Sequence, residues 1–359
     1  MDSLAITVVG GGMINPVGVG VAATEAAVRA GINQYSDSPI ERSSGEPYKM
    51  ALVPDECLPV LNSDDPASKQ RLHNNALYRR MLQLGKVALT EACETLNTEH
   101  MIPVFLAVPE QRCGRPFPAL EPIIKDLFQE VDFPLDLLTS RVFPLGRSGG
   151  VNALSEAIKL MLSTPLECMI VGGIDSCMDV ILLNALDAEQ RLMGGGSAGG
   201  FVPGEGAAFI VLKKISEADL MIFHPGVAQE PGHLYSEELC LGNGLSSAIQ
   251  EAVENTGDSL VNMPIQTVFC SMNGEPVNGK EWGTSLIRNS EAISDQFDIE
   301  HPAECYGDLG AATVPSLMAL AALGLEKGYC KGPLLVWSAS DREQRGAVVM
   351  TFNKESGNG

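Results

Sequence analysis

The chain has 359 residues, 45% of them hydrophobic and 19% charged, which is enough for one large core or two fused domains. It carries 45 acidic and 24 basic residues, a formal net charge of -21. An acidic surface repels a phosphate backbone, so the composition excludes nucleic-acid binding that depends on a basic face.

The first half of the chain alternates apolar strand-like and helix-like segments. Hydrophobic periodicity predicts strands over 5–9, 102–108, 139–145, 168–172 and 207–212, and helices over 21–30, 75–96 and 151–162. Residues 32–69 are rich in Ser, Pro, Asp and Glu and are predicted to form an irregular surface segment.

The second half continues this alternation. It has predicted helices over 246–254 and 311–325, and predicted strands over 267–271, 334–338 and 347–352, the last two as a hairpin. Strands that alternate with helices favour an α/β architecture with buried sheets. The glycine-rich stretch 194–200 lacks the Gly-Lys-Ser/Thr of a phosphate loop and is predicted to form the flexible rim of a pocket.

Cysteine and histidine usage argues against a metal protein. The nine cysteines form no CxxC pair and the five histidines lie far apart, so we expect no metal, no cofactor and no disulfide framework. The start of the chain lacks the positive region of a signal peptide, and no apolar run approaches the roughly 20 residues of a membrane span. A cytoplasmic protein is expected.

The junction between strand 139–145 and helix 151–162 reads Gly-Arg-Ser-Gly-Gly over residues 146–150. This matches the G-x-S-x-G nucleophile elbow, in which Ser148 would be the nucleophile, with His301 and Asp308 as its downstream partners. The structural alternative makes Ser148 a helix N-cap or first-turn residue, and we favour it because the rest of the chain does not resemble an α/β-hydrolase.

Four stretches, in chain order, resemble motifs of the β-ketoacyl synthases of the thiolase-fold superfamily. They are residues 8–18 (VVGGGMINPVG), 168–176 (CMIVGGIDS), 201–208 (FVPGEGAA) and 309–312 (LGAA). The third is the most specific, because it keeps the family's F-x-x-G-E-G-A run. The resemblance spans nearly the whole chain, with a trimmed middle and C-terminal region.

This resemblance implies an α/β thiolase fold of five layers, αβαβα, built from two βαβαβαββ halves related by a pseudo-twofold axis. The halves would be residues 1–215 and 216–359. The resemblance also implies a homodimer, or a heterodimer with a ketosynthase-like protein, and an acyl-carrier protein as a further partner.

The family's catalytic residues are missing from the matching positions. Ungapped counting places the family's nucleophilic cysteine at Arg147, its first histidine at Asn273 and its second at Gly307, or at Asp308 with a slip of one residue. The family's Gly/Phe-rich loop near the C-terminus is replaced by residues 340–345, which contain Asp341. A guanidinium is not a nucleophile, so standard condensation is not expected.

A cation at a helix N-terminus opposes the helix dipole, so an acid should lie beside Arg147. The family's glutamate falls at Glu205, which is our first choice for this partner, with Glu281 and Asp308 as alternatives. A buried ion pair there would close the pocket to a thioester.

Two functions follow from this resemblance. The first is a non-catalytic partner or adaptor: a subunit like a chain-length factor, or an accessory protein of a specialised system such as type VI secretion, with or without acyl binding in the old pocket. The alternative is an active acyltransferase or thioesterase that uses Ser148 or a displaced thiol, Cys270 or Cys305.

Overall fold

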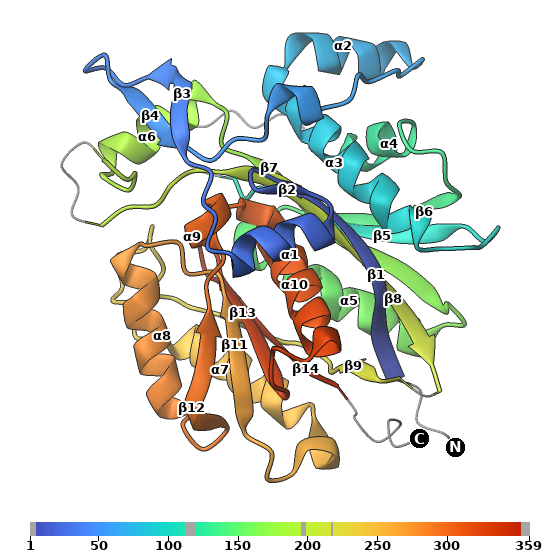
Figure 1. Cartoon of the computed structure of the whole chain (residues 1–359), viewed down its shortest axis with the longest axis vertical. Coiled ribbons are helices and arrows are strands. Elements are labelled where there is room, and N and C mark those ends of the chain that lie inside the picture. Colours follow the sequence, from blue (N-terminus) through green and yellow to red (C-terminus); the bar gives the residue numbers. More distant parts are fainter. Residues whose placement is uncertain (1–4, 112–119, 195–198, 217, 353–359) are drawn as a thin grey trace.

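The computed structural model describes residues 5–111, 120–194, 199–216 and 218–352 (Figure 1). Most of the predicted pocket rim, at 195–198, lies outside these residues. The strands are β1 (Ala5–Asn15), β2 (Gly18–Val19), β3 (Ser36–Glu41), β4 (Pro47–Met50), β5 (Ile102–Ala107), β6 (Leu135–Phe143), β7 (Cys168–Ser176), β8 (Glu205–Ile215), β9 (Leu220–Ile222), β10 (Gly226–Gln229), β11 (Ile265–Cys270), β12 (Ile293–Glu300), β13 (Leu334–Ala339) and β14 (Gln344–Phe352).

Helices flank these strands throughout the chain. They are α1 (Val21–Arg29), α2 (Pro66–Asn74), α3 (Ala76–Glu94), α4 (Ile123–Phe128), α5 (Gly149–Ser163), α6 (Val180–Ala188), α7 (Asn243–Glu254), α8 (Pro276–Arg288), α9 (Ala303–Tyr306) and α10 (Thr313–Lys327). Among the described residues, none of these helices is both long and apolar enough to cross a bilayer.

One strand order occurs twice in the large sheet. The order is β6-β5-β7-β8-β1 in the first half and β12-β11-β13-β14-β10 in the second, with β9 joining β1 to β14. In the first half, β5, β6 and β7 are parallel, and β8 is antiparallel to both of its neighbours. In the second half, β11, β12 and β13 are parallel in the same way, and β14 is antiparallel to β13 and β10. This repetition confirms the two related halves, while the division near residue 215 stays a prediction.

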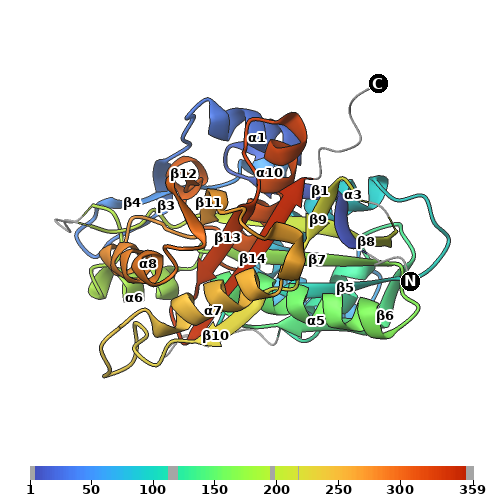
Figure 2. The same ribbon diagram turned by 90° about the horizontal axis from the view of Figure 1, so that it is seen from below.

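Alternate residues of the central strands face different helices and so separate the layers. On β5, Phe105 faces the core around α5 and α10, whereas Val104 and Leu106 face α3. On β13, Leu335 and Trp337 face α7 and α8. Figure 1 shows α10 at the centre with α5 beside it, and in both Figure 1 and Figure 2 these two helices lie between α8 on one side and α3 on the other. The arrangement is the expected five-layered one.

The segment 32–69 is more ordered than its composition predicts. It contains the β3–β4 hairpin and the start of α2. The hairpin forms because Tyr48 and Met50 alternate with exposed neighbours and are buried against Leu182, Leu183 and Phe201. The sequence reading also missed α6, α8 and β12.

Candidate functional site

Arg147 lies at the start of α5, where the sequence analysis placed it. Strand β6 ends at Phe143, and a short 3-10 turn over Gly146–Ser148 leads into α5. Arg147 is only 4% exposed, so its guanidinium points into the protein and needs a counter-charge there.

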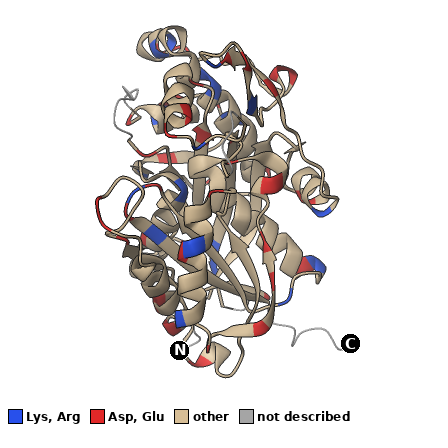
Figure 3. Cartoon of the chain, turned by 90° about the vertical axis from the view of Figure 1, so that its left-hand side faces the viewer, with Lys and Arg blue, Asp and Glu red and all other residues tan. Residues whose placement is uncertain are grey.

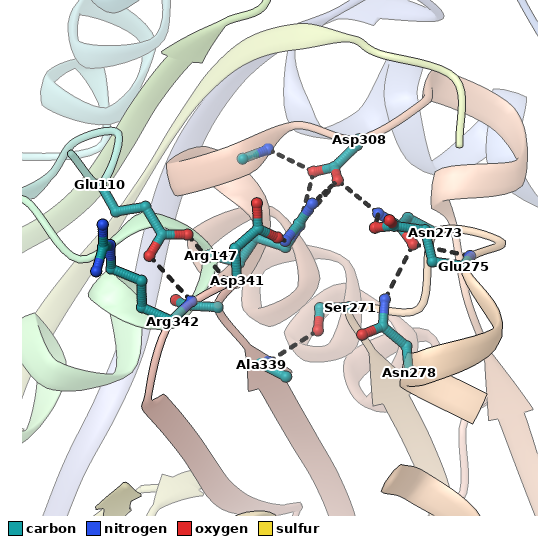
Figure 4. A network of polar contacts seen from close by, with 12 residues as sticks. Glu110, Arg147, Ser271, Asn273, Glu275, Asn278, Asp308, Ala339, Asp341 and Arg342 are labelled. Carbon is teal, nitrogen blue, oxygen red and sulfur yellow. Dashed lines mark hydrogen bonds and ion pairs between the residues drawn. The ribbon is translucent and has the colours of Figure 1, made fainter. Parts of the chain in front are cut away.

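Two carboxylates supply that counter-charge. Arg147 Nε donates to both carboxylate oxygens of Asp308, at 3.1 and 2.8 Å, and its Nη2 also contacts Asp308. Arg147 Nη1 donates to Asp341 Oδ1 at 2.5 Å. Figure 4 shows Arg147 between these two acids. An acid is therefore present beside Arg147, as expected, and Asp308 was one of the three candidates.

The contacts continue into a closed ring. Asp341 also accepts hydrogen bonds from Arg191, at 2.9 and 3.0 Å, and Arg191 donates to Glu275 at 2.7 and 2.9 Å. Asn273 closes the ring, because its Nδ2 donates to Glu275 at 3.1 Å and to Asp308 at 2.7 Å (Figure 4). We call these six residues the central ion network: Arg147, Arg191, Asn273, Glu275, Asp308 and Asp341.

Burial and charge act in opposite directions on the central ion network. Burial alone would lower the pKa of Arg147, but the charges of Asp308 and Asp341 raise that pKa well above its usual value. Burial likewise would raise the pKa of Asp308, and the charge and hydrogen bonds of Arg147 lower it instead. Both side chains therefore stay ionised and paired at neutral pH.

The network fills the space around Arg147. A cavity of about 20 Å³, lined by Phe201, Asp175 and Arg147 among others, adjoins the guanidinium. A space of that size holds about one water molecule. The Phe201 ring lies beside both arginines, with its centroid 5.9 Å from Arg147 Cζ and 5.5 Å from Arg191 Cζ, within cation–π range. An acyl group has no room there.

Ser148 has no catalytic surroundings. Its side chain is fully buried, and the hydroxyl lies 2.8 Å from the Ser338 carbonyl oxygen, to which it donates, and 3.1 Å from that of Gln344. Ser148 occupies the N-cap position of α5 but makes no side-chain cap bond. Its hydroxyl instead ties the start of α5 to β13 and β14.

His301 and Asp308, the expected partners of Ser148, form ion pairs with other residues. His301 Nε2 is 2.6 Å from Glu304 Oε1, and Asp308 belongs to Arg147, which corrects the expected His301–Asp308 pair. The hydroxyl of Ser148 donates to no imidazole among the described residues. A Ser-His-Asp triad is therefore not assembled.

The two histidine positions have changed in different ways. Asn273 uses its whole amide, because its Oδ1 also accepts from Glu275 N at 3.1 Å and Asn278 Nδ2 at 3.0 Å. Gly307 has φ 73°, and a Cβ there would lie 2.8 Å from the Val202 carbonyl oxygen. No side chain fits at Gly307 without a shift of backbone.

Neither glutamate alternative pairs with Arg147, which corrects the first choice made from sequence. Glu205 is held by Arg80, with two hydrogen bonds of 2.6 Å, and also accepts from Val53 N and Ser176 Oγ. Glu281 on α8 pairs with Arg345 Nε at 2.5 Å. Each glutamate neutralises an arginine within its own half.

The two candidate thiols are unreactive by environment. Burial raises the pKa of Cys270 to about 12, and its sulfur lies 3.4 Å from the Glu300 carbonyl oxygen. Burial also raises the pKa of Cys305. A thiol that stays protonated at neutral pH is a poor nucleophile.

One cluster in the described part of the chain resembles a metal site. Ligand atoms of Glu230, Cys240 and Glu281 lie within 4.8 Å of one another. Backbone N–H groups already bind Glu230, and the Arg345 cation binds Glu281, so the positive charge at this place is supplied by the protein.

Three network residues were not selected as candidates from sequence. Asp341 lies in the turn between β13 and β14, inside the segment noted for replacing the family's loop. Arg191 follows α6, and Glu275 precedes α8, two helices that the periodicity did not predict. The one signal in the sequence was Arg147 itself, because a buried cation needs acidic partners.

Comparison with known proteins establishes the fold. No protein-family model and no curated protein matches the sequence. Solved structures do match. The ishigamide ketosynthase/chain length factor has a TM-score of 0.68 at 16% identity, over 97% of this chain and 99% of that one.

Two further structures agree with this match. A type II polyketide ketosynthase bound to its acyl-carrier protein and a hexaketide has a TM-score of 0.72 at 14% identity, over 97% and 99% of the two chains. A ketosynthase in complex with its chain length factor, from Xenorhabdus doucetiae, has a TM-score of 0.69 at 14% identity, over 97% and 98%.

The chain therefore has the fold of these ketosynthase structures over nearly its whole length. Within that fold, it carries Arg147, Asn273 and Gly307 at the positions where the sequence analysis expects a cysteine and two histidines.

Proposed function

We propose that the protein is a non-catalytic, ketosynthase-like subunit that acts by pairing with another protein of the same fold, as a chain-length factor does. The observation that carries this proposal is the central ion network. It places paired side chains, Arg147 and Asn273, at the positions of the family's cysteine and first histidine, and leaves about 20 Å³ beside Arg147.

The network favours a permanent structural role over a masked active site. Opening it to a substrate would leave buried charges without partners, which costs about 3–5 kcal/mol for one broken pair. The centre has two arginines and three carboxylates, so breaking one contact weakens the others that share Asp308 or Asp341.

An exposed strand supports the pairing. Among the residues that the structure describes, β6 is the last strand of the sheet and pairs with β5 alone. Its bulged segment carries Leu138, whose side chain is 97% exposed, next to Leu137. A free edge with exposed leucines is a surface on which a second sheet can add. The occupant we propose is a ketosynthase-like protein, or a second copy of this chain.

Turnover and partner binding test this proposal together. We expect the purified chain to hydrolyse no acyl thioester and to decarboxylate no malonyl thioester above the uncatalysed rate, beside a ketosynthase with a complete Cys-His-His set as the positive control. We also expect it to form a complex with a ketosynthase, measured by light scattering after size exclusion, and to bind acyl-carrier protein only through that complex.

The other outcomes point elsewhere. Turnover by the unmodified chain that is lost in Ser148→Ala would support the alternative function, an acyltransferase or thioesterase. An inactive chain that ignores ketosynthase and carrier protein, but copurifies with secretion-apparatus components, would favour the accessory role in type VI secretion.

A further inference from the structure

A groove lies at the end of the first half-sheet that is opposite the central ion network. It is bounded by the amino-terminal ends of β5 and β7, at Ile102 and Cys168, whereas Arg147 follows the carboxyl end of β6. The two ends of a nine-residue strand such as β7 are about 30 Å apart. The groove has a volume of about 900 Å³, which is the size of a small-molecule site.

Apolar side chains share the lining of the groove with polar ones. Val9 enters it through a β-bulge, since the register between β1 and β8 shifts between Val8 and Gly10. Val9 is 42% exposed and Met101 57% exposed, and bulges commonly re-aim a side chain in this way. The remaining apolar lining is Leu96, Ile102, Pro165 and Leu166. An apolar chain laid along these residues would remove them from water.

The lining of the groove includes Lys213, whose ammonium group makes no hydrogen bond or ion pair in the described part of the chain. Its charge acts on the thiol of Cys168, where burial raises the pKa and Lys213 opposes that rise. The next residue, Lys214, is by contrast held by the carbonyl oxygens of Met161 and Thr164, at 2.8 and 3.0 Å. His100 and Glu167 also line the groove.

We propose that this groove binds a small monocarboxylate with an apolar chain, its carboxylate at Lys213 and its chain along Leu96, Met101 and Leu166. Lys213 supplies the attraction for a single negative charge in a protein of net charge -21. Glu167 in the same lining disfavours ligands of higher negative charge, such as phosphates.

The thiol of Cys168 provides a direct readout, because it lines the groove and is partly exposed. Burial raises the pKa of Cys168 to about 11, so its alkylation is slow enough to follow. Cys57 is also partly exposed, lies outside the groove lining, and serves as an internal control. The experiment is iodoacetamide labelling of the full chain with increasing octanoate, followed by peptide mass spectrometry.

We expect octanoate at about four times its Kd to slow Cys168 labelling about fivefold, as single-site occupancy requires, with no change at Cys57. Lys213→Gln should weaken the octanoate effect about threefold, the loss expected for one exposed charge pair, and Lys280→Gln on α8 should not change it. Met101→Glu should weaken it as well, through repulsion of the carboxylate.

Three results would overturn the proposal. These are unchanged Cys168 labelling in millimolar octanoate, equal protection of Cys57, and equal protection by octanoate and 1-octanol in both the unmodified chain and Lys213→Gln. None of them bears on catalysis at Arg147, so the groove and the proposed function fail independently.

Discussion

At the scale of single residues, Arg147 is a buried cation whose partners depend on it. Removing the guanidinium would leave Asp308 charged inside the protein, and would take one of two cations from Asp341. Arg147→Met is expected to lower the free energy of unfolding by about 3–5 kcal/mol. Urea titration followed by the fluorescence of Trp282 and Trp337 measures this change.

Two further variants make that measurement specific. Arg79→Met, at an exposed arginine of α3, should change the stability by less than about 0.5 kcal/mol. Adding Asp308→Asn to Arg147→Met should recover part of the loss, because the carboxylate left without its cation is then neutral. A double variant as unstable as the sum of the singles would mean that the pair is not coupled.

The depressed pKa of Asp308 predicts a dependence on pH. A folded-state pKa below the unfolded value of 3.8 makes the native carboxylate stabilising above that value, and the contribution is lost as pH falls through the folded pKa. The loss of stability between pH 5 and pH 2.5, approximate limits set by the usual carboxyl range, should be smaller in Asp308→Asn than in the unmodified chain.

The matched control for this titration is Asp295→Asn, at an exposed carboxylate on β12. Its stability should follow the same pH curve as the unmodified chain. Equal slopes for Asp308→Asn and the unmodified chain would contradict an ionised Asp308 in the folded protein.

At the scale of elements, the start of α10 depends on a glycine that leaves no space for a side chain. Gly310 opens the 3-10 turn before α10 with φ 51°, and a Cβ there would lie 1.9 Å from Asp175 Oδ2. Gly310→Ala should therefore destabilise the fold by more than about 1–2 kcal/mol. Thermal unfolding checks this.

The same substitution in an open position has the opposite expected effect. Gly283 lies inside α8, and no atom lies within 4 Å of the Cβ position. Gly283→Ala should stabilise the protein by about 0.5–1 kcal/mol, the helix preference of alanine over glycine. Similar losses in both variants would show that α10 does not depend on the conformation at Gly310.

The elements that the sequence predicted are those with strong apolar periodicity, such as α3, α10, β7 and β13. The missed ones depend on tertiary contacts. Helix α8 contains Gly279 and Gly283, which lower its helix propensity, yet it is held by Trp282 stacking on Trp337. Strand β12 is an acidic edge strand with little apolar alternation.

At the scale of the whole molecule, the central ion network joins the two halves. Both arginines precede residue 215, and Asn273 and all three carboxylates follow it. Sequence reasoning found Arg147, Asn273 and Asp308 because motifs align there. It could not find Arg191 or Asp341, because their partners are set by loops that meet only after the halves pack (Figure 4 shows Asp341 beside Arg147).

The surface of the assembled molecule sets the last prediction. On the side drawn in Figure 3, which is opposite to the side of β6 in Figure 1, acidic and basic residues are interspersed. Leu138→Asp on β6 should weaken self-association or pairing with a ketosynthase by at least about tenfold, since a charge would be buried at the contact. Sedimentation velocity measures this.

Ile287→Asp on α8 is the control for the change in charge, because Ile287 is also exposed and α8 lies on the opposite side of the molecule from β6 (Figure 1). It should leave association unchanged. An effect of the same size in both variants would assign the association to added charge and not to β6.

The most direct measurement is the intact mass of the protein after incubation with a reactive acyl thioester, with peptide mapping of any adduct. Because a paired guanidinium fills the reactive position and the nearby hydroxyl and thiols are buried, we predict an unchanged mass at Ser148, Cys270 and Cys305. A stoichiometric acyl adduct on any of these three residues would contradict the account.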